Sequence, residues 1–432
     1  MKKFTISQFL QASYFLFILF ALLFGRSFMG LYIFGYRIGE LVMGVALLFT
    51  LFLILNRNIT YKYFNSKTTN LYYILIFFAI ISAVLSNSSF LNLYTYKSNS
   101  YLLAISFFFI SYIIFQKTQI SYKLITVFQV SLIYVYILST VSYPSFLVNF
   151  FKTYSDKFDY NKASSLAIFF IIVIYITNRT KNLKSYTYGY LFILSGVFLP
   201  LFLYKSRGSF LAVLLFIFFE IIFHRKEILQ YPIKNLIFFS IALFIFIQSS
   251  FDLTDNEFNI QETSSVVNEL LDQKNSKIDF LTFFIDDSRL YSTDHNVNWR
   301  LQIWQDVLFG SISENKFFLG YGYGDILPAM EIEARRGNDG TNENVHNFLF
   351  NMLGRGGFVQ VLLYLALISS IYFNKSNMRS YDFLIFVFPI FLISFFDASL
   401  ENSHFPIIFY SALGYIYKKD LKQFKYSIEE NY

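Results

Sequence analysis

Three side chains in this sequence have the types and positions that a transfer reaction at a membrane surface requires. His346 stands where a long polar stretch returns to apolar sequence, Arg207 begins an apolar run, and Arg300 lies within the polar stretch. An imidazole accepts a proton near neutral pH, and a guanidinium donates two parallel hydrogen bonds to a phosphate. Together they would hold a pyrophosphate leaving group and activate an incoming hydroxyl.

Each of these residues also has a plain structural interpretation. A lone histidine at a membrane boundary is more often an interfacial residue with a hydrogen bond, and an arginine at the start of a span is usually a snorkelling anchor. The neighbours of Arg207 favour binding, because Gly208 and Ser209 let a ligand approach the backbone and a helix N-terminus attracts anions. Arg335 and Arg336 are further candidate cations, although such a pair in a polar loop is more often solvated.

Acidic residues offer two other possibilities. Asp286 and Asp287 could bind a divalent metal, but a solvated acidic loop is the commoner meaning of such a pair. Asp397 and Glu401 lie in one short polar stretch and are candidates to orient an acceptor or to pair with an arginine. The chain contains no cysteine, which excludes disulfides, thiolate metal sites and cysteine nucleophiles.

Membrane-spanning helices must position these residues. Of the 432 residues 55% are hydrophobic and 15% are charged, against about 25% charged in soluble domains. Because lipid offers the backbone no hydrogen-bonding partners, apolar runs of this kind predict helices and an all-α polytopic membrane protein. Runs of roughly 17 to 25 residues predict about twelve spans, which begin near residues 8, 38, 71, 101, 123, 164, 187, 208, 235, 346, 381 and 403.

One polar segment divides the chain into three parts. We expect an N-terminal bundle of about nine helices over residues 1–249, a large outer loop over residues 250–345, and about three helices with a tail over residues 346–432. The first span follows Met1-Lys2-Lys3 without a small-residue cleavage site, so it is expected to remain as a helix.

The polar segment contains patterns of its own. Trp299, Ile303 and Val307 recur at helical spacing, which predicts an amphipathic helix over residues 298–312 that lies on the outer leaflet with its tryptophans at headgroup level. Another helix is expected over residues 259–274, and a glycine-aromatic turn follows at 319–324.

The charge distribution predicts the orientation. The short segments on one side hold about 19 Lys and Arg and those on the other side about 8, which places both termini in the cytoplasm and the polar segment outside. That segment has 17 acidic and 7 basic residues and therefore a net charge of −10. Because the whole chain has a net charge of +7, the rest of the chain carries +17. The basic balance therefore reflects membrane topology and not nucleic acid binding.

Three motifs together resemble the O-antigen ligase/O-antigen polymerase family of bacterial envelope proteins. KSRGSFLAVLLF has a Ser-Arg element with an Arg-x3-Leu spacing, NWRLQIW…FFLGYGYGD has an arginine, an amphipathic helix and a Gly-x-Gly element, and NVHNFLFNMLGRGGF has a His-Asn element with a His-x10-Gly spacing. The later DASLENSHFPIIFYSALG is similar to the family's last outer turn and helix. The order of these motifs around one large outer loop is more specific than any single motif.

The resemblance implies a GT-C type inverting glycosyltransferase in the bacterial inner membrane, active at the periplasmic face without a metal or other cofactor. It would move a glycan from undecaprenyl pyrophosphate to a hydroxyl in lipopolysaccharide or related polysaccharide biosynthesis. Arg207 and Arg300 would bind the pyrophosphate, and His346 would activate the acceptor hydroxyl. Substrate-binding roles are also expected for Lys205, Asn347, Tyr321, Arg335, Arg336 and Glu401.

The spacings leave the acceptor open. Ligases of the family use a lipid A-core sugar, polymerases another lipid-linked repeat unit, and relatives that glycosylate proteins use a serine or threonine hydroxyl. Polymerases are described with Arg-x10-Gly elements, which the Arg300–Gly310 spacing misses by one residue. The Arg-x3-Leu and His-x10-Gly spacings favour a ligase.

Other classes of function fit less well. A flippase or other transporter of about twelve spans would place charged groups at the membrane midplane, whereas these spans are nearly free of central ionisable residues. A metal-dependent GT-C transferase would carry acidic residues in its first outer loop, but residues 25–37 contain none. An adhesion or scaffold role has no positive support in the sequence.

Overall fold

The computed structural model describes residues 6–115, 122–140, 143–156, 158, 161–180, 187–252, 283–293, 295–336, 342–373, 380–401 and 404–417. The described chain is mostly helical, with two short β-hairpins. The helix expected over residues 259–274 and the basic residues after 417 lie outside the described residues.

The helices follow one another along the chain as α1 (Ile6–Met29), α2 (Ile38–Leu55), α3 (Arg57–Tyr63), α4 (Ser66–Leu85), α5 (Leu93–Ser98), α6 (Ser100–Leu103), α7 (Ser106–Phe115), α8 (Tyr122–Thr140), α9 (Ser145–Tyr154), α10 (Ala163–Thr180), α11 (Thr187–Lys205), α12 (Arg207–Phe223), α13 (Arg225–Ile228), α14 (Pro232–Asp252), α16 (His295–Ser313), α17 (Phe348–Phe373), α18 (Ser380–Asp382), α19 (Phe388–Phe396) and α20 (His404–Ile416). The antiparallel hairpins pair β1 (Tyr32–Ile33) with β2 (Tyr36–Arg37) and β3 (Phe283–Asp286) with β4 (Arg289–Ser292).

Several helices are long and apolar enough to cross a membrane. Within the described residues there are seven of them: α1, α2, α4, α8, α11, α14 and α17. Four more predicted spans correspond to the shorter apolar segments Ser100–Phe115, Ala163–Arg179, Phe383–Phe396 and His404–Ile416, and the span expected near residue 208 is the 17-residue α12. The structure thus agrees with a polytopic helical membrane protein, while the number of spans and the three-part division stay predictions.

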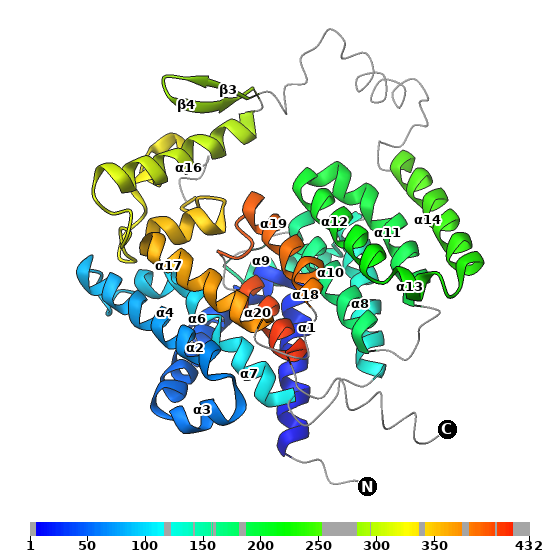
Figure 1. The fold of residues 1–432 in the computed structure, drawn as a ribbon, viewed down its shortest axis with the longest axis horizontal. Helices are drawn as coiled ribbons and strands as arrows, with labels where there is room; N and C mark the ends of the chain where they lie inside the picture. The colour runs from blue at the N-terminus through cyan, green and yellow to red at the C-terminus, as the bar shows by residue number, and fades with distance from the viewer. Residues whose placement is uncertain are drawn as a thin grey trace.

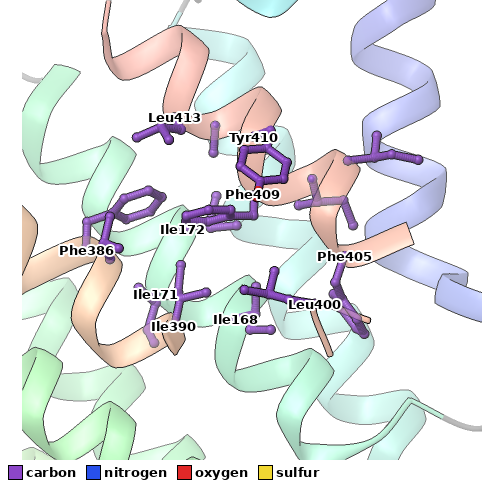
Figure 2. Packing of buried hydrophobic residues seen from close by; sticks show 14 of the residues in the cluster. Ile168, Ile171, Ile172, Phe386, Ile390, Leu400, Phe405, Phe409, Tyr410 and Leu413 are labelled. Carbon is purple, nitrogen blue, oxygen red and sulfur yellow. The ribbon is translucent and has the colours of Figure 1, made fainter. Parts of the chain in front are cut away.

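Apolar side chains from distant parts of the sequence form the main core. Figure 2 shows Ile168, Ile171 and Ile172 of α10 packed among side chains of the segment that leads into α19 and of α20, among them Phe386 and Phe409. These residues are almost completely buried, so α10 and α20 are held at a fixed distance from each other. Both helices begin at the end of the bundle where the candidate site lies.

The polar segment sits over the start of α17. In Figure 1, α16 and the β3–β4 hairpin lie at the top of the molecule, and the short helix α3 lies at the bottom. Helix α17 bends at Gly357, whose φ of 73° suits glycine. A Cβ at this position would lie 2.3 Å from the Phe318 carbonyl, so the turn after α16 packs directly against the bend.

The amphipathic helix predicted over residues 298–312 is present as α16, but its predicted orientation is wrong. Ile303, Trp304 and Val307 are buried in a small second core with residues near the start of α17. The Trp304 indole N–H donates to the Val345 carbonyl at 2.9 Å, and its ring stacks on Phe350. The protein itself therefore supplies the apolar surface and the hydrogen-bond acceptor that the sequence interpretation assigned to lipid headgroups.

Candidate functional site

His346 lies on a strained turn between the second core and α17. Its φ is +56°, a conformation that few residues other than glycine adopt. The Trp299 ring contacts the imidazole edge to face, with 5.1 Å between ring centroids. The side-chain nitrogen of Asn342 lies 3.3 Å from Nε2, and because an amide N–H only donates, Nε2 is the nitrogen that accepts. Backbone strain at a half-buried histidine is typical of a functional position.

Asn347 fixes this turn from below. Its side-chain oxygen accepts hydrogen bonds from the backbone N–H groups of Leu349 at 3.0 Å and Phe350 at 3.2 Å, so it caps the first turn of α17. The residue is completely buried. Asn347 therefore has a structural role in this turn, and the substrate contact expected for it stays a prediction.

Charges from four other elements surround the imidazole. The pKa of His346 is lowered from 6.5 to about 4, mainly by burial and then by the positive charges of Arg300, Lys162 and Arg26, whereas the carboxylate of Asp397 acts in the opposite direction. The imidazole is therefore neutral at pH 7 and can accept a proton. Of the four charges that act on this imidazole, three are positive and one is negative.

Arg300 and the start of α12 meet at Phe396, the last residue of α19. Arg300 Nη1 donates to the Phe396 carbonyl. A Cβ at Gly208 would lie 3.1 Å from the Phe396 side chain, so the first turn of α12 lies against the same residue. Ser206 caps that turn by accepting from the backbone N–H of Ser209. The structure thus brings the helix start that carries Arg207 beside the residue that Arg300 binds.

Sequence reasoning missed Arg26 and Lys162. Arg26 follows a break in α1 at Gly25. Asn161, which precedes Lys162, donates to the Leu23 carbonyl at 2.8 Å, and this bond ties the start of α10 to the last part of α1. Both cations act on His346. The signal that could have found them is that each is a basic residue on the side of the membrane where the positive-inside rule predicts few.

Asp397 and Glu401 follow α19 and lie close to the His346 turn. Asp397 accepts a hydrogen bond from the Ser164 hydroxyl at the start of α10. Burial raises the pKa of Glu401 to about 8, as does the nearby charge of Asp397, while backbone N–H groups of Asn347 and Val345 act to lower it. Glu401 therefore lies beneath the His346 turn, only 8% exposed, and supports the turn where a direct contact with an acceptor was expected.

Arg335 and Arg336 hold the polar segment together. Arg335 forms an ion pair with Asp306 of α16 at 2.6 Å and donates to the Ala329 carbonyl. Arg336 donates to the Met330 carbonyl at 3.3 Å. These bonds fasten the loop between α16 and α17, so the structure assigns both arginines contacts within the loop.

Lys205 and Tyr321 also lie apart from the imidazole. The Lys205 ammonium donates to the Ser139 carbonyl at the end of α8. Tyr321 lines a groove beside the C-terminal half of α16, where burial and Glu314 raise its pKa to about 12. Neither residue is brought into the group of charges that acts on His346.

The acidic pair considered for metal binding occupies a hairpin. Asp286 ends β3 and Asp287 lies in the turn to β4, with a φ of 43°. Across the ranges that the structure describes, no group of three or more His, Asp or Glu side chains is placed to hold a metal ion.

The arrangement suits a reaction with an anionic leaving group. An anion among Arg300, Arg26 and Lys162 would offset the charges that depress the pKa of His346. The imidazole would then become more basic at the moment when the leaving group is in place. Such a base can take a proton from a neutral hydroxyl while the cations stabilise the charge that develops on the departing phosphate.

Comparison with known families agrees with these observations. The sequence model described as O-antigen ligase matches residues 190–365. The matched region runs from within α11 into α17 and includes Arg207, Arg300 and His346. No curated protein matches the chain. Residues 190–365 therefore match the O-antigen ligase family, and the three motifs around Arg207, Arg300 and His346 lie in their expected order within this match.

Proposed function

We propose that the protein is an inverting membrane glycosyltransferase that moves a glycan from undecaprenyl pyrophosphate to an acceptor hydroxyl. The acceptor is a lipid A-core sugar or another lipid-linked repeat unit, and the reaction takes place at the periplasmic face of the bacterial inner membrane. One observation carries the proposal: a neutral imidazole on a strained turn is surrounded by the charges of Arg300, Arg26 and Lys162. The family supports the polysaccharide context.

The proposed chemistry is a single displacement. The acceptor oxygen attacks the anomeric carbon from the side opposite to the pyrophosphate, and the bond from that carbon to the phosphate oxygen breaks with its electron pair on the oxygen. Nε2 of His346 takes the hydroxyl proton once the acceptor hydroxyl replaces the side chain of Asn342 as its hydrogen-bond donor. Attack from the opposite side inverts the configuration of the sugar.

The cations act on the leaving group. Arg207 and Arg300 would bind the two phosphates with paired hydrogen bonds, and Arg26 and Lys162 add positive charge around the same anion. Because a pyrophosphate is already a good leaving group, the cations can offset the developing charge without a metal ion in this scheme. Added EDTA is accordingly expected to leave the transfer rate unchanged.

Removal of the imidazole tests the proposal. In proteoliposomes that contain the lipid-linked glycan, His346→Ala should lower the transfer rate by about 10²- to 10⁴-fold, the usual contribution of a general base. The melting temperature should stay near that of the wild type, because His346 has few partners to lose. A well-folded His346→Ala variant that transfers glycan at the wild-type rate would exclude His346 as the base.

Glycan profiles of a deletion strain separate the two acceptors. Loss of core attachment together with intact lipid-linked chains indicates a ligase. Single repeat units on the core indicate a polymerase. The transporter alternative predicts a third result, in which lipid-linked repeat units accumulate on the cytoplasmic face of the membrane.

A further inference from the structure

A groove beside the C-terminal half of α16 is separate from the His346 turn. Its cavity volume is ≈ 400 Å³, within the range of about 300 to 1,000 Å³ that is usual for small-molecule sites. Residues of α16 form one wall, and Tyr321 with the turn at Leu327 and Pro328 forms another. The reaction described above assigns no role to this groove.

The lining of the groove mixes polar and apolar groups. Asp306, Ser313 and Glu314 offer hydrogen-bonding groups, while Phe309 and Ile332 offer apolar surface. A sugar ring has the same two kinds of surface, because its hydroxyls extend from the edge and its C–H groups cover the faces. Carboxylate oxygens accept hydrogen bonds from hydroxyls, and apolar or aromatic side chains cover the C–H faces.

The charges of the groove favour a neutral ligand. Asp306 forms ion pairs with both Arg289 and Arg335, so its charge is offset within the protein. Glu314 and Tyr321 interact closely enough to raise the pKa of the tyrosine to about 12, with burial as the larger cause. The groove therefore differs from the surroundings of His346, where three of the four charges that act on the imidazole are positive, and it suits hydroxyl groups better than phosphates.

Helix α16 connects the groove with the reaction site. Arg300 lies toward its start and Gly310 toward its end, and ten residues of helix span about 15 Å. The second core holds this helix in place, and Val307 of that core also lines the groove. A ligand with several sugar residues would therefore reach from the groove toward the imidazole.

We propose that the groove binds a neutral stretch of oligosaccharide at a distance from the bond that reacts. The proposal rests on the proposed function for the identity of the reaction, but the binding itself can be measured without any turnover. The bound sugars belong either to the acceptor or to the donor glycan, and both sources present the same ring faces and hydroxyls.

Gly310 gives direct access to the groove for a test. A Cβ at this position would lie 3.0 Å from the Tyr321 hydroxyl, so Gly310→Leu fills the groove, and the change favours the helix by propensity. Ile312→Trp is the matched control, because Ile312 lies on the same helix, is 54% exposed and does not line the groove.

Binding is measured by saturation-transfer NMR on the purified full-length protein. The probe is the oligosaccharide that mild acid releases from the cell's own lipid-linked precursor, so it carries no pyrophosphate. We expect the wild type, Ile312→Trp and His346→Ala to bind it, and Gly310→Leu to bind at least tenfold more weakly. Absence of binding to the wild type, or equal binding by Gly310→Leu, would overturn the proposal.

Kinetics then distinguish the source of the sugars. In Gly310→Leu, a raised KM for the acceptor alone assigns the groove to the acceptor glycan, and a raised KM for the donor alone assigns it to the donor glycan. If neither KM changes, the groove has no part in the reaction and the proposal fails. Because His346→Ala enters the binding test without turnover, a failure of the proposed chemistry leaves that test interpretable.

Discussion

Two charged regions of this molecule differ in how positive and negative side chains are combined. At the far end of α10 and α12, Arg179 forms an ion pair with Asp382, its Nη1 lies 3.0 Å from Nε2 of His224, and Nδ1 of the same ring lies 2.8 Å from the carboxylate of Glu220. Each carboxylate of this region lies beside a nitrogen of Arg179 or His224, so its charged groups face one another within the protein.

The charges that act on His346 are mostly of one sign. Arg300, Lys162 and Arg26 act on the imidazole together with a single carboxylate, that of Asp397. Repulsion between like charges destabilises a folded protein. An anionic ligand bound among the cations offsets this repulsion. The comparison indicates that the network around Arg179, the inner network, holds helices together. The charges around His346, the outer charges, suit an anionic ligand.

The largest expected effect breaks the inner network. Asp382→Ala removes the carboxylate partner of Arg179 and leaves a buried cation, which costs about 3–5 kcal/mol when such a pair is broken. Thermal melting in detergent should show this loss, and the protein that stays folded should keep its turnover number per active molecule. A variant with wild-type stability would mean that the network does not join these helices.

The next effect concerns the outer charges. Arg300→Lys keeps the charge but loses the planar fork, so the transfer rate should fall by about 10²- to 10³-fold, as when one donor to a developing oxyanion is removed. Arg336→Lys is the matched control, because Arg336 donates to a backbone carbonyl of the same segment. Equal rates for the two variants would contradict a role of Arg300 in binding the leaving group.

Much of the architecture could be predicted from the sequence, because apolar length and helical periodicity are local properties. The start of α12, the helix α16 and the return to apolar sequence at His346 all lie close to their predicted positions. Periodicity does not say whether an apolar face meets lipid or protein, and for this reason the orientation of α16 was predicted wrongly.

The composition of the site depended on tertiary contacts. Arg26 and Lys162 reach His346 because Asn161 binds the end of α1, a contact between residues 138 positions apart that no local pattern encodes. Asn347 was expected at the substrate because it follows His346, but its side chain caps α17. Adjacent residues on a turn can serve the ligand and the backbone separately.

A smaller effect is expected at Glu401, which lies near His346 but supports the backbone of the turn. Its pKa of about 8 in the folded protein exceeds the unfolded value of 4.5, so the folded state holds its proton more tightly and wild-type stability falls as pH rises from 4.5 to 8. Glu401→Gln removes this loss. The variant should melt higher than the wild type at pH 8, and the difference should shrink toward pH 5.

An exposed carboxylate provides the control for this measurement. Glu343 forms an ion pair with Lys97 at 2.6 Å near the surface, where such pairs contribute about 0–1 kcal/mol. Glu343→Gln should therefore change the melting temperature little over the same pH range. If Glu401→Gln loses transfer activity at every pH while it melts higher, the carboxyl group also has a part in positioning His346.

The finest test of the comparison is the pH dependence of transfer. In the free protein the pKa of His346 is about 4, so kcat/KM, which reports the free enzyme, should not lose this base until the pH falls near 4. A bound pyrophosphate offsets the charges of Arg300, Lys162 and Arg26 and raises the pKa of the imidazole. The acid limb of kcat, which reports the complex, should therefore lie at a higher pH than the acid limb of kcat/KM.

The variant Arg26→Gln should move the acid limb of kcat/KM to higher pH, because one of the charges that lower the pKa of His346 is gone. The difference in pH between the two limbs should then become smaller. Coincident limbs in the wild type would mean that the anion binds too far from the imidazole to act on it, and the outer charges would then require another ligand.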